Sequence, residues 1–240
     1  MKHVFGKSMV FMAGILMLCA SCSTTKKMNK EEKGVSVGAA GGAVIGGIIG
    51  NNVGNKKNTA LGAIIGAVIG GAAGGIIGNK MDRQAEVIKQ EIPGAEVTRV
   101  GEGINVTFNE NNPDGSKAGV YFETNKSDIS SNSTLALNKL VKVFNSYPET
   151  NILIEGHTDN VGEADYNTTL SKKRATEVAD FIAAKGILKP RLTVKWYGES
   201  QPKVENSSDT NKALNRRVEF AITANDKMKE EAAKEAANKN

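Results

Sequence analysis

The sequence predicts an α+β sandwich, in which helices pack on a mixed β-sheet, preceded by a glycine-rich helical hairpin. Two observations indicate this fold class. From residue 118 onward, short apolar strand-like runs alternate with helix-like repeats, which is the pattern of helices packed on a sheet. Between residues 34 and 80, glycine recurs at every fourth position over two runs, and on a helix this spacing places the glycines on one face.

The composition is that of a globular protein with no strong charge preference. The chain has 240 residues, of which 24% are charged and 40% hydrophobic, and these values are ordinary for folded domains. The formal net charge is +5, and Lys2 and Lys7 contribute two of these charges from a segment that we expect to be removed. A charge this weak and dispersed does not indicate nucleic-acid binding.

Residues 1–21 have the features of a secretory signal peptide. A basic start is followed by an apolar run at residues 9–18, which is too short to span a bilayer. The CASC stretch then resembles a bacterial lipobox, although Cys19 stands where leucine is usual. We therefore predict that Cys22 becomes an acylated first residue that carries palmitate. The alternative is an ordinary signal peptide cut near Cys22.

A polar tether at residues 22–33 is expected to lead into a helical hairpin at residues 34–80. Two uncharged glycine-rich runs flank a short polar link at residues 55–58. Because glycine costs about 1 kcal/mol per position in a helix interior, isolated aqueous helices are not expected here, whereas a glycine stripe suits closely packed helices in lipid. A soluble or oligomer-buried hairpin and a flexible linker are the alternatives. The glycines stand at positions 34, 38, 42, 46, 50 and 54 and at positions 62, 66, 70, 74 and 78.

Residues 81–117 are predicted to form a connecting helix and a β-hairpin. Residues 81–90 have an amphipathic pattern that ends at a Pro-Gly pair. Two strand-like runs at 97–100 and 104–108 then flank a Gly-Glu-Gly turn, which is a hairpin signature.

The segment from 118 to 225 is predicted to hold one core built in the order β-α-β-α-β, followed by a loop with a short helix and a last strand. The first strand is expected at residues 120–122. The run at 152–154 is continuously apolar, as in a strand covered on both faces. Trp196 alternates with apolar neighbours and is expected in the core. The two main helices and the last strand are marked by the spacing of Leu137, Leu140, Val141 and Phe144, of Ala175, Val178, Ala179 and Ile182, and of Val218, Phe220 and Ile222. The charged tail at 226–240 is expected to be a solvated helix with frayed ends.

A carboxylate and a guanidinium flank the predicted strand-to-helix turn at 154–175. Asp159 follows the strand, and Arg174 shares one helix face with Asn167 and Ser171. Two interpretations remain open from the residues alone. Asp159 and Arg174 could pair with each other and leave no pocket, or they could bind opposite charges of one ligand.

Catalytic and metal sites are not indicated. His157 is the only histidine outside the predicted signal peptide, which leaves no plausible zinc set, and a structural role beside the strand end is expected. A wall hydrolase is the weakest alternative, because residues 118–225 contain no GxSxG motif. We predict no enzymatic activity, no metal and no cofactor.

Five blocks of this region resemble the OmpA-like peptidoglycan-binding domain, in that family's order and spacing, over residues 118–224. The glycine-zipper hairpin and lipobox resemble a subgroup of OmpA-like outer-membrane lipoproteins. One departure is the stretch before NRRVEF, which reads DTNKALNRR where the family usually carries a Gly-Arg or similar pair. The five blocks are FETNKSDI (122–129), IEGHTDNVG (154–162), NTTLSKKRA (167–175), YGESQP (197–202) and NRRVEF (215–220).

The resemblance implies a site and a cellular role. The domain would bind the diaminopimelate of the peptidoglycan stem peptide, with Asp159 holding the ammonium and Arg174 the carboxylate. The protein would be lipid-anchored in the outer membrane, face the periplasm and tether that membrane to the wall. A glycine-zipper homo-oligomer or envelope assembly is the alternative function. Five further residues match positions that line the family's pocket: Asn125, Thr158, Asn167, Asn215 and Arg216.

Overall fold

The structure is a computed structural model that describes residues 71–108, 120, 122 and 127–238. The predicted signal peptide, the tether with Cys22, most of the glycine-rich hairpin and Asn125 lie outside the described residues. Among the residues that the structure describes, no helix combines the length and apolar character needed to cross a membrane.

The centre of the fold is a mixed sheet of five strands in the order β1-β2-β5-β3-β4. Every neighbouring pair is antiparallel except β3 and β4, which are parallel and joined through α5. This arrangement confirms the predicted α+β class and the predicted hairpin before the domain. The strands are β1 (Glu96–Val100), β2 (Gly103–Phe108), β3 (Thr150–Gly156), β4 (Leu192–Trp196) and β5 (Val218–Ala224).

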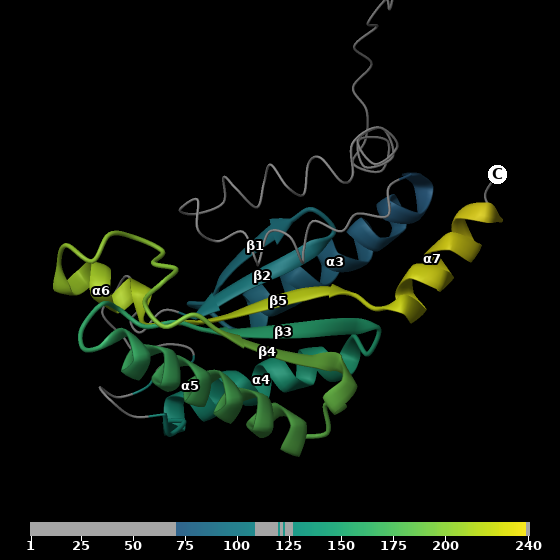
Figure 1. Ribbon diagram of the computed structural model, residues 1–240. Coiled ribbons are helices and arrows are strands. Elements are labelled where there is room, and N and C mark those ends of the chain that lie inside the picture. The colour runs from purple at the N-terminus through teal and green to yellow at the C-terminus, as the bar shows by residue number, and fades with distance from the viewer. Residues whose placement is uncertain (1–70, 109–119, 121, 123–126, 239–240) are drawn as a thin grey trace, which may run out of the picture.

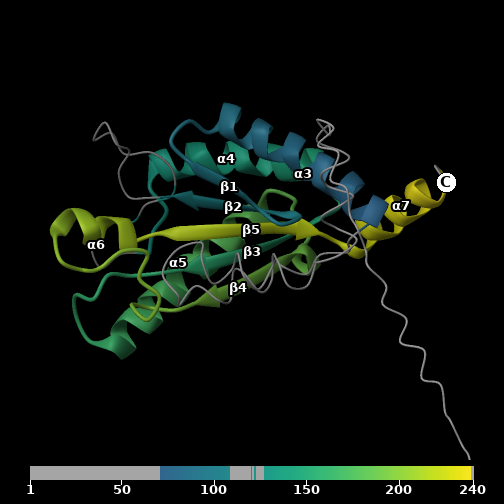
Figure 2. The same cartoon turned by 90° about the horizontal axis from the view of Figure 1, so that it is seen from above.

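Helices pack against the sheet and extend beyond both of its ends. In Figure 1, α5 runs along β3 and β4, while α3 lies against β1 at the other edge. Both views place α6 and α7 at opposite ends of the sheet (Figures 1 and 2). The helices are α3 (Gly71–Glu91), α4 (Ser131–Ser146), α5 (Ala164–Ala184), α6 (Asp209–Asn215) and α7 (Asp226–Ala237), with a short 3-10 turn η1 (Lys189–Arg191) before β4.

The core forms where the predicted apolar stripes meet. Leu137, Leu140 and Phe144 of α4 are fully buried, and the Phe144 ring packs against Phe220 of β5 with 6.2 Å between centroids. Ser130 is the N-cap of α4, because its hydroxyl accepts a hydrogen bond from the Ser133 amide. Both predicted main helices and the last strand are therefore confirmed. Apolar residues that recur with a period of 3.6 or 2 are reliable signals of a helix or a strand.

Helix α3 differs from the prediction because it begins inside the second glycine run. It continues without a break through Gly74 and Gly78, so the predicted boundary at residue 80 falls within one helix. Ile77 and Met81 are completely buried in the domain core. The last turns of the glycine-rich segment therefore belong to the folded domain.

The C-terminal tail is a helix, as expected, but it is not a solvated end. Met228 and Ala232 of α7 are buried in the core, and Ala236 is nearly so. Lys80 of α3 lies 3.6 Å from the Glu231 carboxylate. The prediction was wrong because alanine and methionine at every fourth position give only a weak apolar signal among so many lysines and glutamates.

Two smaller predictions also need correction. Trp196 is 39% exposed, because it ends the edge strand β4, and its ring lies 4.6 Å from the Lys172 ammonium. The strand expected at 120–122 is not assigned at Val120 or Phe122, the two residues of that run that are described. Both side chains are nevertheless buried in the core.

Candidate functional site

A cavity of about 210 Å³ opens at the α6 end of the sheet, where the loop after β3 meets α5. It brings together side chains from three parts of the chain that are distant in sequence. Asp159 and Arg174, the two residues central to the sequence analysis, both line it. The lining residues are Thr158, Asp159, Val161, Asn167, Leu170, Arg174, Asp209, Lys212 and Arg216.

Asp159 is held in place by two hydrogen-bond donors. Its Oδ1 accepts the Val161 amide at 3.0 Å, and its Oδ2 accepts Arg216 Nη1 at 2.6 Å. The Asp159 side chain is only 9% exposed, so this carboxylate is largely shielded from water, whereas its Arg216 partner is 29% exposed. Each carboxylate oxygen has room for a second donor, and the carboxylate therefore keeps acceptor capacity toward the cavity.

Arg174 reaches the cavity from the buried face of α5. The residue is 3% exposed, and its guanidinium carbon lies 5.1 Å from the centre of the Phe122 ring. Asn167, Ser171 and Arg174 are all buried on this helix, as their predicted shared face requires. The interpretation in which Asp159 and Arg174 leave no pocket is not supported, because a cavity lined by both is present.

Asn167 fixes the loop that carries Asp159. Its Nδ2 lies 3.3 Å from the Asp159 carbonyl oxygen, 3.2 Å from that of Val161 and 2.7 Å from Glu199 Oε2. The Thr158 amide donates to the Gly198 carbonyl at 2.9 Å, while the buried Thr158 hydroxyl has no partner among the described residues. The backbone of the loop is thus fixed before any ligand arrives.

A close approach between α5 and β3 brings the two halves of the site together. A Cβ atom built on Gly156 would lie 2.3 Å from the Ser171 carbonyl oxygen, so only glycine fits at this point. The Ser171 hydroxyl donates to the Thr168 carbonyl and accepts the Gly198 amide, both at 2.9 Å. The sequence GHTD therefore needs its glycine to seat the helix that bears Arg174.

Asn215 does not line the cavity, which corrects its predicted placement. Its side chain is fully buried and holds the preceding loop instead. Its Oδ1 accepts the amides of Lys203 and Val204, and its Nδ2 donates to the Val204 carbonyl and to Asn206 Oδ1, at 2.8 to 3.1 Å. Arg216, the next residue, does face the cavity.

Four lining residues were not predicted from the sequence: Val161, Leu170, Asp209 and Lys212. Asp209 and Lys212 lie on α6 and carry charge. The only sequence signal for this helix was the stretch DTNKALNRR, which departs from the family pattern.

Next to the cavity residues in sequence, five polar or aromatic side chains form a cluster in which all but the half-buried Tyr197 are buried. The Glu155 and Glu219 carboxylates face each other across paired strands β3 and β5. Tyr197 donates its hydroxyl to Glu155 at 2.8 Å, and Arg217 forms an ion pair with Glu219. The His157 ring stacks on Tyr197 with 5.3 Å between centroids. Arg217 adjoins Arg216, and its carbonyl accepts the His157 amide at 3.0 Å, so the cluster and the cavity are joined through neighbouring residues.

Burial determines the protonation of two side chains in the cluster, Glu155 and His157. It raises the pKa of Glu155 to about 7, and the Glu219 charge acts in the same direction. Burial and the nearby Arg217 charge hold the pKa of His157 well below its ordinary value, so His157 is neutral. Potential ligand atoms of Glu155, His157 and Glu219 lie within 4.8 Å of one another, a convergence that the sequence did not indicate. The Arg217 guanidinium already supplies a cation at this place.

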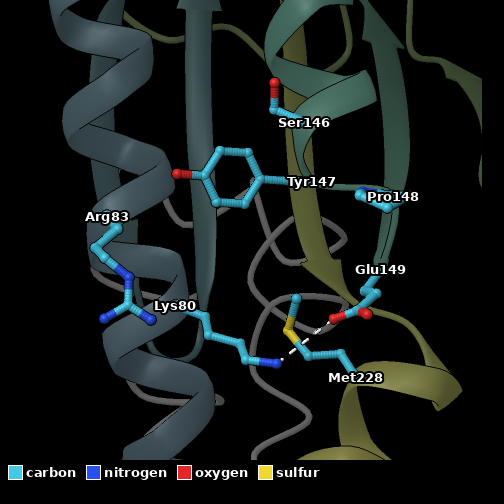
Figure 3. Close-up of a pocket in the computed structure, with 7 residues that line it drawn as sticks. All are labelled: Lys80, Arg83, Ser146, Tyr147, Pro148, Glu149 and Met228. Atoms are coloured by element: carbon cyan, nitrogen blue, oxygen red, sulfur yellow. Dashed lines mark hydrogen bonds and ion pairs between the residues drawn. The ribbon is translucent and has the colours of Figure 1, made fainter.

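A second cavity of about 260 Å³ lies at the opposite end of the molecule, between α3 and α7 (Figure 3). Lys80 points across it toward Glu149, with 3.5 Å between Nζ and Oε2. Lys227 of α7 lies 3.3 Å from the other oxygen of Glu149. These ion pairs join α3 and α7 to the turn before β3. The lining residues are Lys80, Arg83, Ser146, Tyr147, Pro148, Glu149 and Met228.

Comparison with known proteins gives two family matches. Residues 121–216 match the OmpA family, and residues 1–82 match the YMGG-like Gly-zipper family. These matches confirm both parts of the resemblance seen in the sequence.

The relatives include outer-membrane proteins and lipoproteins. Outer membrane porin F of Pseudomonas fluorescens is 37% identical over 105 residues, which are 44% of this chain and 32% of the porin. The probable lipoprotein YiaD of Escherichia coli is 31% identical over 146 residues, which are 61% of this chain and 64% of YiaD. The peptidoglycan-associated lipoprotein of Brucella melitensis is 33% identical over 99 residues, 41% of this chain and 59% of the relative. The chain thus spans about a third of the porin and less than two thirds of either lipoprotein.

A solved structure shares the fold. The crystal structure of a putative MotB-like protein from Desulfovibrio vulgaris superposes with a TM-score of 0.50 at 28% identity, covering 62% of this chain and 89% of that one. The extended α+β domain with its mixed sheet is therefore an architecture already known.

Proposed function

We propose that this chain, which carries an OmpA family domain at residues 121–216, binds peptidoglycan without a covalent bond and tethers the outer membrane to the cell wall. The observation that carries the proposal is the cavity shared by Asp159 and Arg174. The names of the relatives, a peptidoglycan-associated lipoprotein and an outer-membrane porin, support the same role.

The ligand group is the diaminopimelate side chain of the stem peptide. Its free end carries an ammonium and a carboxylate on one carbon atom. Asp159 would accept the ammonium, sharing its carboxylate with Arg216, and the planar fork of Arg174 would bind the carboxylate. Thr158 and Asn167 would complete the lining, and Asn125 remains a proposed member from outside the described residues. Leaving one of these charges unpaired costs about 2–5 kcal/mol, which would exclude stems with a singly charged side chain.

The membrane end of the tether is proposed to be lipid on Cys22, facing the periplasm. One acyl chain gives only marginal anchoring, whereas several chains or an added hairpin make it durable. The N-terminal half of α3 lies beside α7, and the cavity lies beside α6 at the other end of the sheet (Figures 1 and 2). A lipid anchor before α3 would then pull on the end of the domain opposite to the wall.

The proposal is tested with full-length protein in mild detergent and purified sacculi. Parent protein should sediment with sacculi, whereas Asp159→Ala and Arg174→Ala should remain in the supernatant. Asp180→Ala and Arg83→Ala are matched controls, because both side chains are exposed and lie outside the cavity. Sedimentation of both cavity variants at the parent level would reject the proposed site.

Two further measurements complete the test. Titration with synthetic stem tripeptides that carry diaminopimelate or lysine at the third position should show binding of the first only. Incubation with sacculi should release no soluble fragments, because the proposed role is structural. Released fragments would favour a wall hydrolase instead.

A second candidate function is self-association through the glycine-rich segment, and the four-residue glycine ladder favours it. Two glycines of that ladder, Gly74 and Gly78, lie on α3, which packs within the folded domain. The proposal therefore concerns residues 34–70. Replacing Gly46 and Gly70 with leucine should lower the mass on native sizing in mild detergent, and an unchanged mass would remove this candidate.

A further inference from the structure

The cavity carries more positive charge than diaminopimelate can balance. Three cationic side chains line it, namely Arg174, Lys212 and Arg216, against the two carboxylates of Asp159 and Asp209. A side-chain end with one ammonium and one carboxylate is neutral overall and leaves the lining with one positive charge in excess. A ligand with an additional carboxylate would match the lining better.

Lys212 is the cation that remains available for this carboxylate. Asp159 is engaged with Arg216 at 2.6 Å, and Arg174 is assigned to the first carboxylate. The Lys212 side chain is 29% exposed, and its ammonium lies 3.9 Å from the Asp209 carboxylate. Asp209 is fully exposed to water, so this contact is weak and readily replaced.

The backbone holds Lys212 at a fixed place relative to Asp159. Helix α6 begins at a cap in which the Ser208 hydroxyl accepts the Asn211 amide at 3.2 Å. The Lys212 carbonyl accepts the Arg216 amide at 3.1 Å, and the Arg216 side chain binds Asp159 directly. One short helix thus fixes two cations on the same wall of the cavity.

Stem peptides offer such a carboxylate beside diaminopimelate. The preceding glutamate is linked through its side chain, so its α-carboxylate is free unless it is amidated. The main-chain centre of diaminopimelate supplies another carboxylate when the stem ends there. Both sources present the same chemical group to a lysine at the cavity rim.

We propose that Lys212 binds a second carboxylate of the stem peptide, next to the diaminopimelate, and thereby makes the site selective for stems in which that carboxylate is free. This inference rests on the proposed function of the same cavity. Lysine acts here as a point charge that tolerates several approach directions, which suits a carboxylate on a flexible peptide.

The test is a calorimetric titration of full-length protein in mild detergent with three synthetic tripeptides of alanine, γ-linked glutamate and diaminopimelate. One tripeptide has all carboxylates free, one is amidated at the glutamate α-carboxylate, and one is amidated at the main-chain carboxylate of diaminopimelate. Parent protein should bind one amidated form about fivefold more weakly than the free form, the size expected for a partly exposed charge pair. The amidated form that is weakened identifies the source of the carboxylate.

Lys212→Gln should abolish that difference by weakening the free tripeptide and leaving the sensitive amidated form unchanged. Lys234→Gln, an equal change of charge at an exposed position on α7, should leave the fivefold difference intact. If Lys212→Gln weakens all three tripeptides equally, or none of them, the inference is wrong while the proposed function stands. If parent protein binds no tripeptide, the proposed function and the inference both fail.

Discussion

Replacing Glu155 with glutamine should stabilise the protein at neutral and alkaline pH. Glu155 is 2% exposed and lies directly across the sheet from Glu219, so two carboxylates share one buried place. Glutamine is nearly isosteric, its oxygen can still accept the Tyr197 hydroxyl, and its amide can donate to Glu219. The substitution therefore removes a charge and keeps the hydrogen bonding.

The sign follows from the direction of the pKa shift. Burial raises the pKa of Glu155 from 4.5 to about 7 in the folded protein. Between these two values the folded state binds more protons than the unfolded state, so the free energy of unfolding falls as the pH rises. The stabilising proton is fully present below pH 4.5 and is lost by the time the pH exceeds about 7. At about 1.4 kcal/mol per unit, the loss approaches about 3 kcal/mol.

Thermal unfolding followed by circular dichroism at pH 5, 6, 7 and 8 measures this effect. At pH 8, Glu155→Gln should exceed the parent melting temperature by several degrees, since about 1 kcal/mol corresponds to about 2–4 °C in a protein of this size. At pH 5 the two proteins should melt closely together. Glu177→Gln, an exposed change on α5, is the control. A difference between variant and parent that does not change from pH 5 to pH 8 would refute the reasoning.

Three other predictions concern stability. Gly156→Ala forces a methyl group against the Ser171 carbonyl oxygen and should cost about 3 kcal/mol in urea unfolding, with weaker binding to sacculi; a cost below about 0.5 kcal/mol would contradict the close approach of α5 to β3. Asn215→Ala leaves two amides of the loop at 203–206 without their acceptor and should cost about 2 kcal/mol, whereas Asn211→Ala, at a half-buried position, should cost less. A fragment that lacks α3 should melt well below one that retains it, because α3 covers part of the core, and equal melting temperatures would show that α3 is dispensable.

The regular elements could be predicted because each has a strong apolar period. The stripe on α4 and the alternation of β5 both lead to side chains that are completely buried. Failures occurred where the apolar signal was weak or had two interpretations. On α3, Ile77 and Met81 continue a stripe that begins among glycines, so the glycine spacing concealed the start of a packed helix. On α7, alanines at every fourth position bury a face that is otherwise charged.

The prediction that Trp196 lies in the core was wrong for a different reason. Alternation along a strand indicates which face a side chain occupies, but not whether the strand lies at the centre or the edge of the sheet. β4 is an edge strand, and Trp196 at its end is partly open to water beside Lys172. The order of strands in the sheet depends on contacts between distant segments. The alternation of apolar residues along one strand carries no information about those contacts.

For the candidate site, the sequence indicated the residues whose positions depend on local structure. Asp159 follows a strand, and Arg174 shares a helix face with Asn167, so spacing indicated two opposite charges near one turn. The resemblance to the OmpA-like domain implied that they share one pocket. The role of Asn215 could not be predicted, because it depends on the path of a loop that its side chain itself holds. Lys212 was missed for the same reason, since the position of α6 beside the cavity depends on the path of the same loop.

The cavity and the cluster of Glu155, His157, Tyr197, Arg217 and Glu219 are linked through consecutive residues. Asp159 is two residues after His157, and Arg216 directly precedes Arg217, so the cavity pair and the cluster share the same two backbone segments. The His157 amide joins those segments through the Arg217 carbonyl. Any change that shifts Glu219 or Arg217 would therefore move Asp159 and Arg216 together. Because paired strands resist such shifts, the sheet can keep both charges in place, as the proposed tethering role would require.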